Sequence, residues 1–175
     1  MSVHIEVNSN EVIESVNAKR KKIELAIVKA LNRTALWLKA KAAKEISEEK
    51  KIKLTVMRRR LRIFKAKTSR LEVLIRANLY DIRVSSMSKM KQTRRGTKIG
   101  KHEFIGAFTA TMPRGYKGAF KREGRAALPI QEVKLRLEPE ASRIIEDFVN
   151  YEVEKVFTKF FERELSYITG NERFA

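Results

Sequence analysis

The side chains that could support catalysis or bind a metal are few and lie far apart in the sequence. The two histidines, His4 and His102, lack partners at the spacing of metal ligands, and cysteine is absent. No phosphate-binding loop, nucleophile elbow or zinc-protease motif occurs. The adjacent carboxylates Glu48–Glu49 and Glu146–Asp147 fall on expected helices or helix ends, where solvated carboxylates are the rule. We therefore expect a protein that is not an enzyme and that holds neither a metal nor a cofactor.

Basic side chains supply most of the remaining chemistry. The 175 residues include 39 Lys and Arg against 21 Asp and Glu, a net charge of +18. Residues 1–137 hold 34 basic and 12 acidic side chains, whereas residues 138–175 hold 5 and 9. A field of this kind favours a polyanion or an acidic protein surface as partner. It also allows the acidic end of one copy to dock on the basic surface of the next.

Two basic stretches are candidates for contact with nucleic acid. Residues 50–70 contain ten Lys and Arg and no acid, and their apolar spacing predicts a short helix over 54–64. This helix is either a connector with a solvated basic face or a nucleic-acid-binding helix without base-reading Asn or Gln. Residues 85–99 show no periodicity and are expected to form a flexible loop. The candidate DNA-facing residues of this loop are Lys89, Lys91, Arg94, Arg95 and Lys98.

Long helices near both ends of the chain must position these side chains. Apolar residues at spacings of three, four or seven predict a helix over residues 11–46. Its expected buried stripe is Val12, Val16, Ile23, Ile27, Leu31, Thr34, Leu38, Ala42 and Ile46. A second helix should begin at residues 138–140 and end near Thr169, with Gly170 after it. Its broad apolar face is either core or a subunit interface that includes Phe157, Phe160 and Phe161.

Strands are expected outside these helices. Alternating apolar residues predict a short edge strand at residues 2–8, a strand at residues 71–77 and a short strand at residues 80–84. Residues 102–137 alternate turn-forming residues with short apolar runs, which predicts three further strands. The first of these three is expected to run through Gly106.

The expected fold class is α+β in a single domain that covers residues 1–175. It consists of a long N-terminal helix, a short basic helix, an antiparallel sheet of about four to five strands and a long C-terminal helix. No apolar run approaches the length of a transmembrane helix, and the N-terminus lacks the pattern of a signal peptide. We expect no association with a membrane.

Short motifs occur in order along most of the chain. They are Ala30-Leu31-Asn32-Arg33, Gly106-Ala107-Phe108, Arg114-Gly115, Phe120-Lys121-Arg122-Glu123-Gly124 and Leu128-Pro129-Ile130. In this order and spacing the chain resembles, over about residues 11–167, the minor tail protein Z family of lambda-like phages and prophages, the tail completion proteins. The residues that carry the resemblance are Asn32, Arg33, Gly106, Phe108, Gly115, Phe120, Arg122, Gly124 and Pro129.

The resemblance implies a structural virion protein. It implies a homo-oligomeric ring, a hexamer, at the head-proximal end of the tail, beside the tail terminator, the tail tube and the tape measure protein. Such a ring would complete the tail at the neck and give viral DNA a path through its lumen. The resemblance also implies a location in the virion after assembly in the host cytoplasm.

The residues alone leave other functions open. The main alternative is a monomeric or dimeric basic nucleic-acid-binding module that uses residues 58–70 and 89–98. It explains the charge, but it gives no role to the predicted strands around Gly106-Ala107-Phe108 or to the apolar face of the C-terminal helix. A small nuclease or toxin has least support, because a metal-dependent nuclease needs carboxylates that converge from separate elements.

Overall fold

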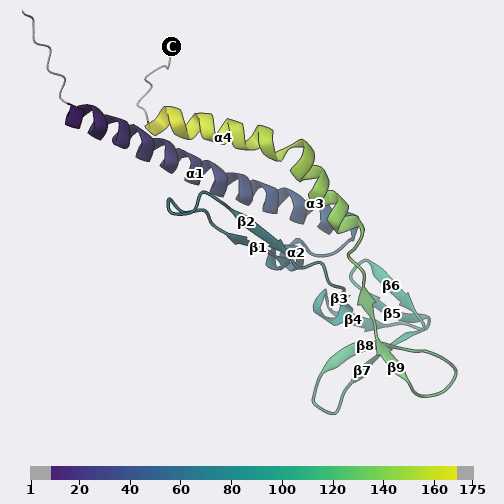
Figure 1. Cartoon of the computed structure of the whole chain (residues 1–175). Helices are drawn as coiled ribbons and strands as arrows, with labels where there is room; N and C mark the ends of the chain where they lie inside the picture. The colour runs from purple at the N-terminus through teal and green to yellow at the C-terminus, as the bar shows by residue number, and fades with distance from the viewer. Residues whose placement is uncertain (1–8, 169–175) are drawn as a thin grey trace, which may run out of the picture. The chain divides into compact units, whose positions relative to one another are not determined.

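The computed structural model describes residues 9–168, and for residues 9–15 it gives the backbone path only (Figure 1). The strand expected at residues 2–8 and the helix end expected at Thr169 and Gly170 lie outside the described residues. The elements, in chain order, are α1 (Ser9–Glu49), α2 (Leu54–Arg60), β1 (Leu61–Phe64), β2 (Leu74–Ala77), β3 (Ile82–Arg83), the 3₁₀ helix η1 (Val84–Ser86), β4 (Met90–Gln92), β5 (Gly96–Ile99), β6 (His102–Ile105), β7 (Ala107–Thr111), β8 (Lys117–Arg122), β9 (Ile130–Glu132), β10 (Lys134–Leu135), α3 (Glu140–Tyr151) and α4 (Val153–Ile168).

These elements confirm the α+β fold class, with a long N-terminal helix, a short basic helix, antiparallel strands and long C-terminal helices. The strands are divided among four small sheets, β1-β2, β3-β10, β4-β5-β6 and β7-β8-β9. The described residues fall into two compact units. The helical unit contains residues 9–38, 63–75 and 150–168, and the sheet unit contains Lys39–Arg62 and Arg76–Val149.

Small residues form the most buried line on α1. Buried positions recur every four residues, which places them on one face of the helix: Ala26, Ala30, Thr34, Leu38, Ala42 and Ile46. The predicted stripe is confirmed from Thr34 onward. Before Thr34 it holds only in part, because Ile27 and Leu31 are half-buried whereas Val16 is 58% and Ile23 41% exposed. Small side chains allow a neighbouring element to approach closely, which explains alanine at the start of this line, before the larger Leu38 and Ile46.

A residue in the left-handed conformation ends α1. Lys51 has φ +49°, a region that residues other than glycine rarely adopt. Ser47 Oγ donates to the Ile52 carbonyl at 2.6 Å, and Ile52 N donates to the Ser47 carbonyl at 3.0 Å. These bonds satisfy backbone groups that lose their helical partners where the helix stops.

Two basic segments differ from their predicted structures. The loop predicted over residues 85–99 is wrong, because β4 and β5 pair there with Met90 opposite Ile99 and Lys91 opposite Lys98. The helix predicted over residues 54–64 is too long, since α2 ends at Arg60 and β1 follows directly.

Gly106 interrupts the strand that was predicted to pass through it. Its φ is +73°, which glycine adopts without strain. Before Gly106, β6 pairs with β5; after it, β7 pairs with β8. The Gly106 N–H donates to the Arg95 carbonyl at 2.9 Å. The chain therefore changes from one sheet to another at this glycine.

The predicted C-terminal helix is divided at Glu152 into α3 and α4. In the sheet unit, α3 buries Ala141, Ile144 and Phe148. In the helical unit, α4 buries the side chain of Glu164. Among the described residues, no helix has the length and apolar character needed to cross a membrane.

An ion pair in the sheet unit joins the chain after α1 to the start of α3. Lys50 Nζ lies 2.7 Å from Glu140 Oε2. That oxygen is inaccessible to solvent, although the Glu140 side chain as a whole is 39% exposed. The hydrogen bond from Lys50 lowers the pKa of the Glu140 carboxyl below its ordinary value, and a backbone hydrogen bond at the helix start lowers it further.

We expect this ion pair to be lost in acid. A carboxyl whose pKa is lower in the folded than in the unfolded state stabilises the fold above its ordinary pKa, and this stabilisation disappears as the pH falls. The melting temperature of the wild type should exceed that of Glu140→Gln above about pH 5, and the difference should vanish towards about pH 3. Thermal unfolding followed by circular dichroism measures both curves. A difference that stays constant over this range would contradict the assignment.

Candidate functional site

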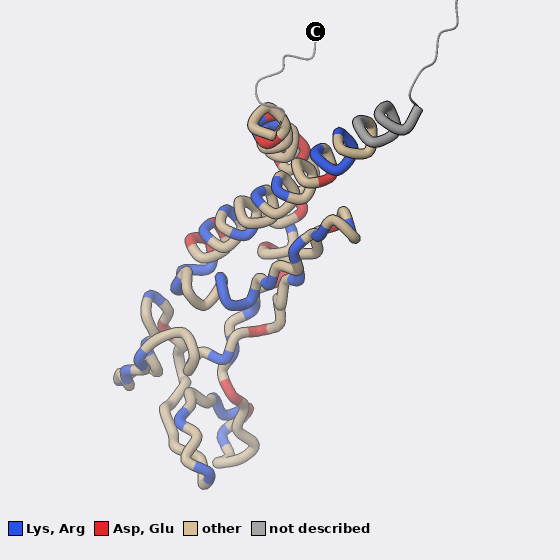
Figure 2. The backbone as a smooth tube through the Cα atoms, turned by 90° about the vertical axis from the view of Figure 1, so that its left-hand side faces the viewer, with Lys and Arg blue, Asp and Glu red and all other residues tan. Residues whose placement is uncertain are grey.

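The five basic residues predicted to face DNA lie on or beside the β4–β5 hairpin. All five side chains are exposed: Lys89, Lys91, Arg94, Arg95 and Lys98. None of them forms an ion pair with another residue in the described part of the chain. Figure 2 shows that Lys and Arg also recur along α1, so the hairpin is one basic surface among several. Contact between this hairpin and DNA stays a prediction.

A single glutamine side chain, at the last residue of β4, holds the turn end of this hairpin. Gln92 Nε2 donates to the carbonyls of Gly96 at 3.0 Å and Ala107 at 3.3 Å. Gln92 Oε1 accepts from the backbone N–H of Thr109 at 2.8 Å. The hairpin is therefore tied to β7 of the adjoining sheet. Arg94 and Arg95 belong to the turn that this glutamine anchors.

The Gly-Ala-Phe and Phe-x-Arg-x-Gly motifs meet across two paired strands. Phe108 of β7 stands opposite Phe120 of β8, and their ring centroids are 6.3 Å apart. The Arg122 guanidinium lies 5.6 Å from the centre of the Phe108 ring, within range of a cation–π contact. These three motif residues form one cross-strand cluster that stabilises the sheet.

The remaining motif residues of the sheet unit shape turns. Gly115 has φ +77°, and its N–H donates to the Met112 carbonyl at 2.8 Å. The Glu123 N–H donates to the Pro129 carbonyl at 3.3 Å, which closes the loop that contains Gly124. A Cβ atom would meet nothing within 4 Å at either of these glycines. The positive φ of Gly115 explains the glycine there, whereas neither the backbone nor the surroundings of Gly124 require one.

A polar cluster in the sheet unit was not predicted from the sequence. Tyr116 OH donates to Glu132 Oε1 and lies 2.8 Å from Ser85 Oγ. Arg83 Nε lies 3.4 Å from Glu132 Oε2, and the Arg83 guanidinium lies 5.9 Å from the Tyr116 ring centre. No sequence signal indicates this cluster, because its members come from β3, η1, the residue before β8, and β9.

Asn32 clamps a distant backbone segment in the helical unit. Its Nδ2 donates to the Ala66 carbonyl at 3.1 Å, and its Oδ1 accepts from the Ala66 N–H at 2.9 Å. Ala66 is buried, so these backbone groups depend on the amide. The side-chain amide of Asn32 thus pairs with the N–H and the carbonyl of Ala66, as the backbone of a neighbouring strand would.

Replacing Asn32 should therefore destabilise the protein. Asn32→Ala removes both hydrogen bonds and should lower the free energy of unfolding by about 1–3 kcal/mol. Asn32→Asp should be no better, because its second carboxylate oxygen would face the Ala66 carbonyl. The matched control is Asn17→Ala on the exposed surface of α1, which should change stability by less than about 0.5 kcal/mol. Urea unfolding measures all three, and equal stability of the two alanine variants would refute the clamp.

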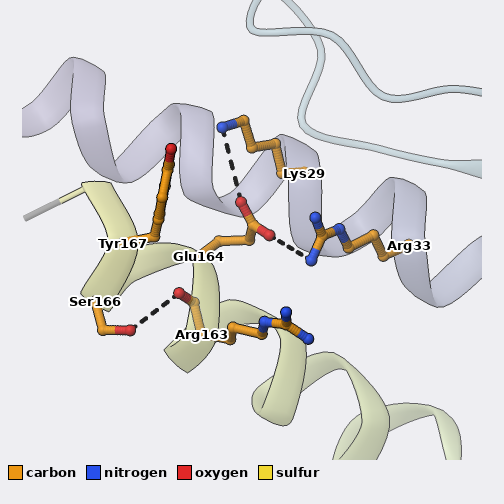
Figure 3. A pocket seen from close by; sticks show the side chains of 6 residues that line it. All are labelled: Lys29, Arg33, Arg163, Glu164, Ser166 and Tyr167. Atoms are coloured by element: carbon orange, nitrogen blue, oxygen red, sulfur yellow. Dashed lines mark hydrogen bonds and ion pairs between the residues drawn. The ribbon is translucent and has the colours of Figure 1, made fainter.

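The neighbouring residue, Arg33, reaches a buried carboxylate on α4. Arg33 Nη1 lies 2.6 Å from Glu164 Oε1, and Lys29 Nζ lies 3.7 Å from Glu164 Oε2 (Figure 3). The Glu164 side chain is only 6% exposed, whereas both cations are about half exposed. Successive helical residues point in directions about 100° apart. This geometry lets Asn32 and Arg33 hold two different elements against α1.

A groove of about 650 Å³ surrounds this ion pair in the helical unit. Arg163, Ser166 and Tyr167 line it with Glu164 and its two cations. Lys29 Nζ also lies 5.9 Å from the Tyr167 ring centre. Glu164 is already paired with two cations. The residues that line the groove are therefore best explained as a polar contact between α1 and α4.

The phenylalanines predicted at a subunit interface lie on α4. Phe157, Phe160 and Phe161 are all half-buried within the single chain. The rings of Phe157 and Phe161 stack with centroids 5.9 Å apart. Nearby Tyr151 is 70% exposed and Tyr167 80% exposed. Their role in a subunit interface stays a prediction.

The described residues contain no group of three or more His, Asp or Glu that could hold a metal ion. His102 Nε2 lies 2.9 Å from the Lys50 carbonyl, which accounts for this histidine as a structural contact. His4 lies outside the described residues.

A protein-family model described as prophage minor tail protein Z (GPZ) matches residues 9–171. Neither a curated protein nor a solved structure shows significant similarity to the chain. The matched span contains every motif described above, from the Asn32 clamp to the loop closed at Pro129.

Proposed function

We propose, because the chain belongs to the prophage minor tail protein Z family, that it completes the phage tail at its head-proximal end. Membership of this family makes it a structural protein of the phage tail, located in the tail of the virion. The proposal adds a hexameric ring at the neck, with a lumen through which DNA passes. The ring would adjoin the tail terminator, the tail tube and the tape measure protein.

The family match over nearly the whole chain carries this proposal. Two features of the surface support it. Aromatic side chains on and beside α4 remain partly or largely exposed in the single chain, which suits burial against a second copy. The basic part up to residue 137 and the acidic part from residue 138 could also attract each other between copies.

Mass measurement by light scattering tests the ring. The wild type should have the mass of six chains, and Phe157→Ser with Phe160→Ser should shift it to single chains that keep their circular dichroism spectrum. The control is Tyr80→Ser, because Tyr80 is 82% exposed in the sheet unit, away from α4 in the sequence. Loss of folding in the double variant would place the two phenylalanines in the core. A monomeric wild type at every concentration would rule out a ring that forms unaided.

A second candidate function is a basic nucleic-acid-binding module, which the exposed and unpaired cations of the β4–β5 hairpin favour. It predicts a monomer of constant mass that binds duplex DNA tightly at low salt. Replacing Lys91, Arg94, Arg95 and Lys98 with Gln should then abolish this binding while the mass stays unchanged.

A further inference from the structure

A groove of about 740 Å³ in the sheet unit is lined by basic and hydroxyl side chains. We call it the basic groove. Its cations are Lys53, Arg59, Lys89 and Lys117, and its hydroxyl side chains include Thr55 and Ser88. No carboxylate lines it. All four cations are exposed, so the groove is open to a ligand.

The basic groove is assembled from three separate segments. Lys53 and Arg59 flank or belong to α2, Lys89 follows η1, and Lys117 begins β8. Buried apolar residues within two of these segments fix the backbone: Met57 in α2, and Val84 and Met87 around η1. The sequence separates Lys53 from Lys117 widely. Only the fold brings these cations together.

The charges of the basic groove are uncompensated. Among the described residues, none of the four cations forms an ion pair. Elsewhere in the same unit, Lys50 pairs with Glu140 and Arg83 pairs with Glu132. Four like charges around one groove repel one another, and this repulsion costs stability unless an anion binds.

We infer that the basic groove binds the phosphodiester backbone of nucleic acid. Lys, Arg, Ser and Thr are the side chains that contact phosphate oxygens, and this groove combines them without an acid. A duplex carries about one charge per 1.7 Å of its axis, so an open groove with several cations can neutralise several phosphates at once. The inference deepens the proposed function, since it names a surface that would face DNA passing through the ring. It differs from the hairpin prediction, with which it shares only Lys89, and takes Lys53 and Arg59 from the basic stretch of residues 50–70.

The test compares two variants of the full chain that lose the same charge. The groove variant carries Lys53→Gln, Arg59→Gln, Lys89→Gln and Lys117→Gln. The control variant carries Lys19→Gln, Lys21→Gln, Lys22→Gln and Lys41→Gln, all at exposed positions of α1. Fluorescence anisotropy measures their binding to a short labelled DNA duplex of unrelated sequence, from about 0.05 to about 0.3 M salt.

The groove variant should bind about a hundredfold more weakly at about 0.1 M salt, and its salt slope should be shallower by about three to four. The control variant should lose about tenfold or less. Equal losses in the two variants, or a wild type that binds no DNA, would overturn the inference. Polyglutamate that competes as well as unlabelled DNA of equal charge would overturn it in favour of an acidic protein partner.

Unfolding of the groove variant is checked by circular dichroism, and two half-variants serve as a second test. Lys53→Gln with Arg59→Gln, and Lys89→Gln with Lys117→Gln, should each produce about half of the change in slope. Light scattering of the same samples separates the two proposals. A hexamer whose groove variant binds DNA like the control rejects the groove alone, whereas a monomeric wild type rejects the ring whatever the groove binds.

Discussion

Replacing Gly96 with alanine should lower the free energy of unfolding by about 3 kcal/mol. A Cβ atom at this position would lie 2.0 Å from the Phe104 carbonyl oxygen, on the neighbouring strand β6. The obstacle is backbone, which cannot swing aside as a side chain can. Relief requires β5 and β6 to separate, and the Gly106 hydrogen bond to Arg95 lies directly beside this contact.

Gly124 provides the control for this prediction. A Cβ atom there meets nothing within 4 Å, so Gly124→Ala should change stability by less than about 0.5 kcal/mol. Urea unfolding followed by circular dichroism compares the two variants. If Gly96→Ala proved as stable as Gly124→Ala, the close approach of β5 and β6 would be wrong.

Replacing Arg33 with alanine should cost about 2 kcal/mol, because it leaves the buried Glu164 carboxylate with only the more distant Lys29. This free-energy cost is smaller than the cost of breaking a fully buried ion pair, because the Arg33 side chain is 47% exposed. Lys29→Ala is the control and should cost less than about 1 kcal/mol, since its ammonium lies 3.7 Å from the carboxylate.

A double-mutant cycle gives this prediction its sharpest form. In a Glu164→Leu background there is no buried carboxylate to leave unpaired, so Arg33→Ala should then cost little. The coupling between the two substitutions should account for most of the 2 kcal/mol expected above. An equal cost of Arg33→Ala in both backgrounds would show that the ion pair does not stabilise the contact between α1 and α4.

Periodicity was sufficient to locate the helices. The predicted first helix over residues 11–46 compares with α1 at Ser9–Glu49, because apolar spacing persists along the whole segment. The hairpin of β4 and β5 was missed for the opposite reason. Its buried face includes Thr97, a polar residue that hides the alternation by which strands are recognised. The break at Gly106 was missed because its flanking residues alternate as one continuous strand would.

The interactions at the candidate site were less predictable than the elements. Asn32 and Arg33 were identified as motif residues, but their partners, Ala66 and Glu164, are distant in sequence. The basic groove was equally unpredictable, because no local sequence pattern links Lys53 to Lys117. Periodicity reports how a segment folds on itself, whereas these contacts depend on which segments become neighbours.

The contacts of Asn32 and Arg33 also restrict insertions and deletions in the part of the gene that encodes α1. Within the helical unit, Ala26 and Ala30 lie on the buried line of α1, and the next two contacts depend on the rotation of the helix. Inserting or deleting one codon between Ala26 and Asn32 would turn the clamp and the ion pair by about 100° away from their partners. Substitutions on the exposed face have no such effect. Natural relatives should therefore keep the spacing from Ala26 to Arg33 unchanged, and should vary in length elsewhere.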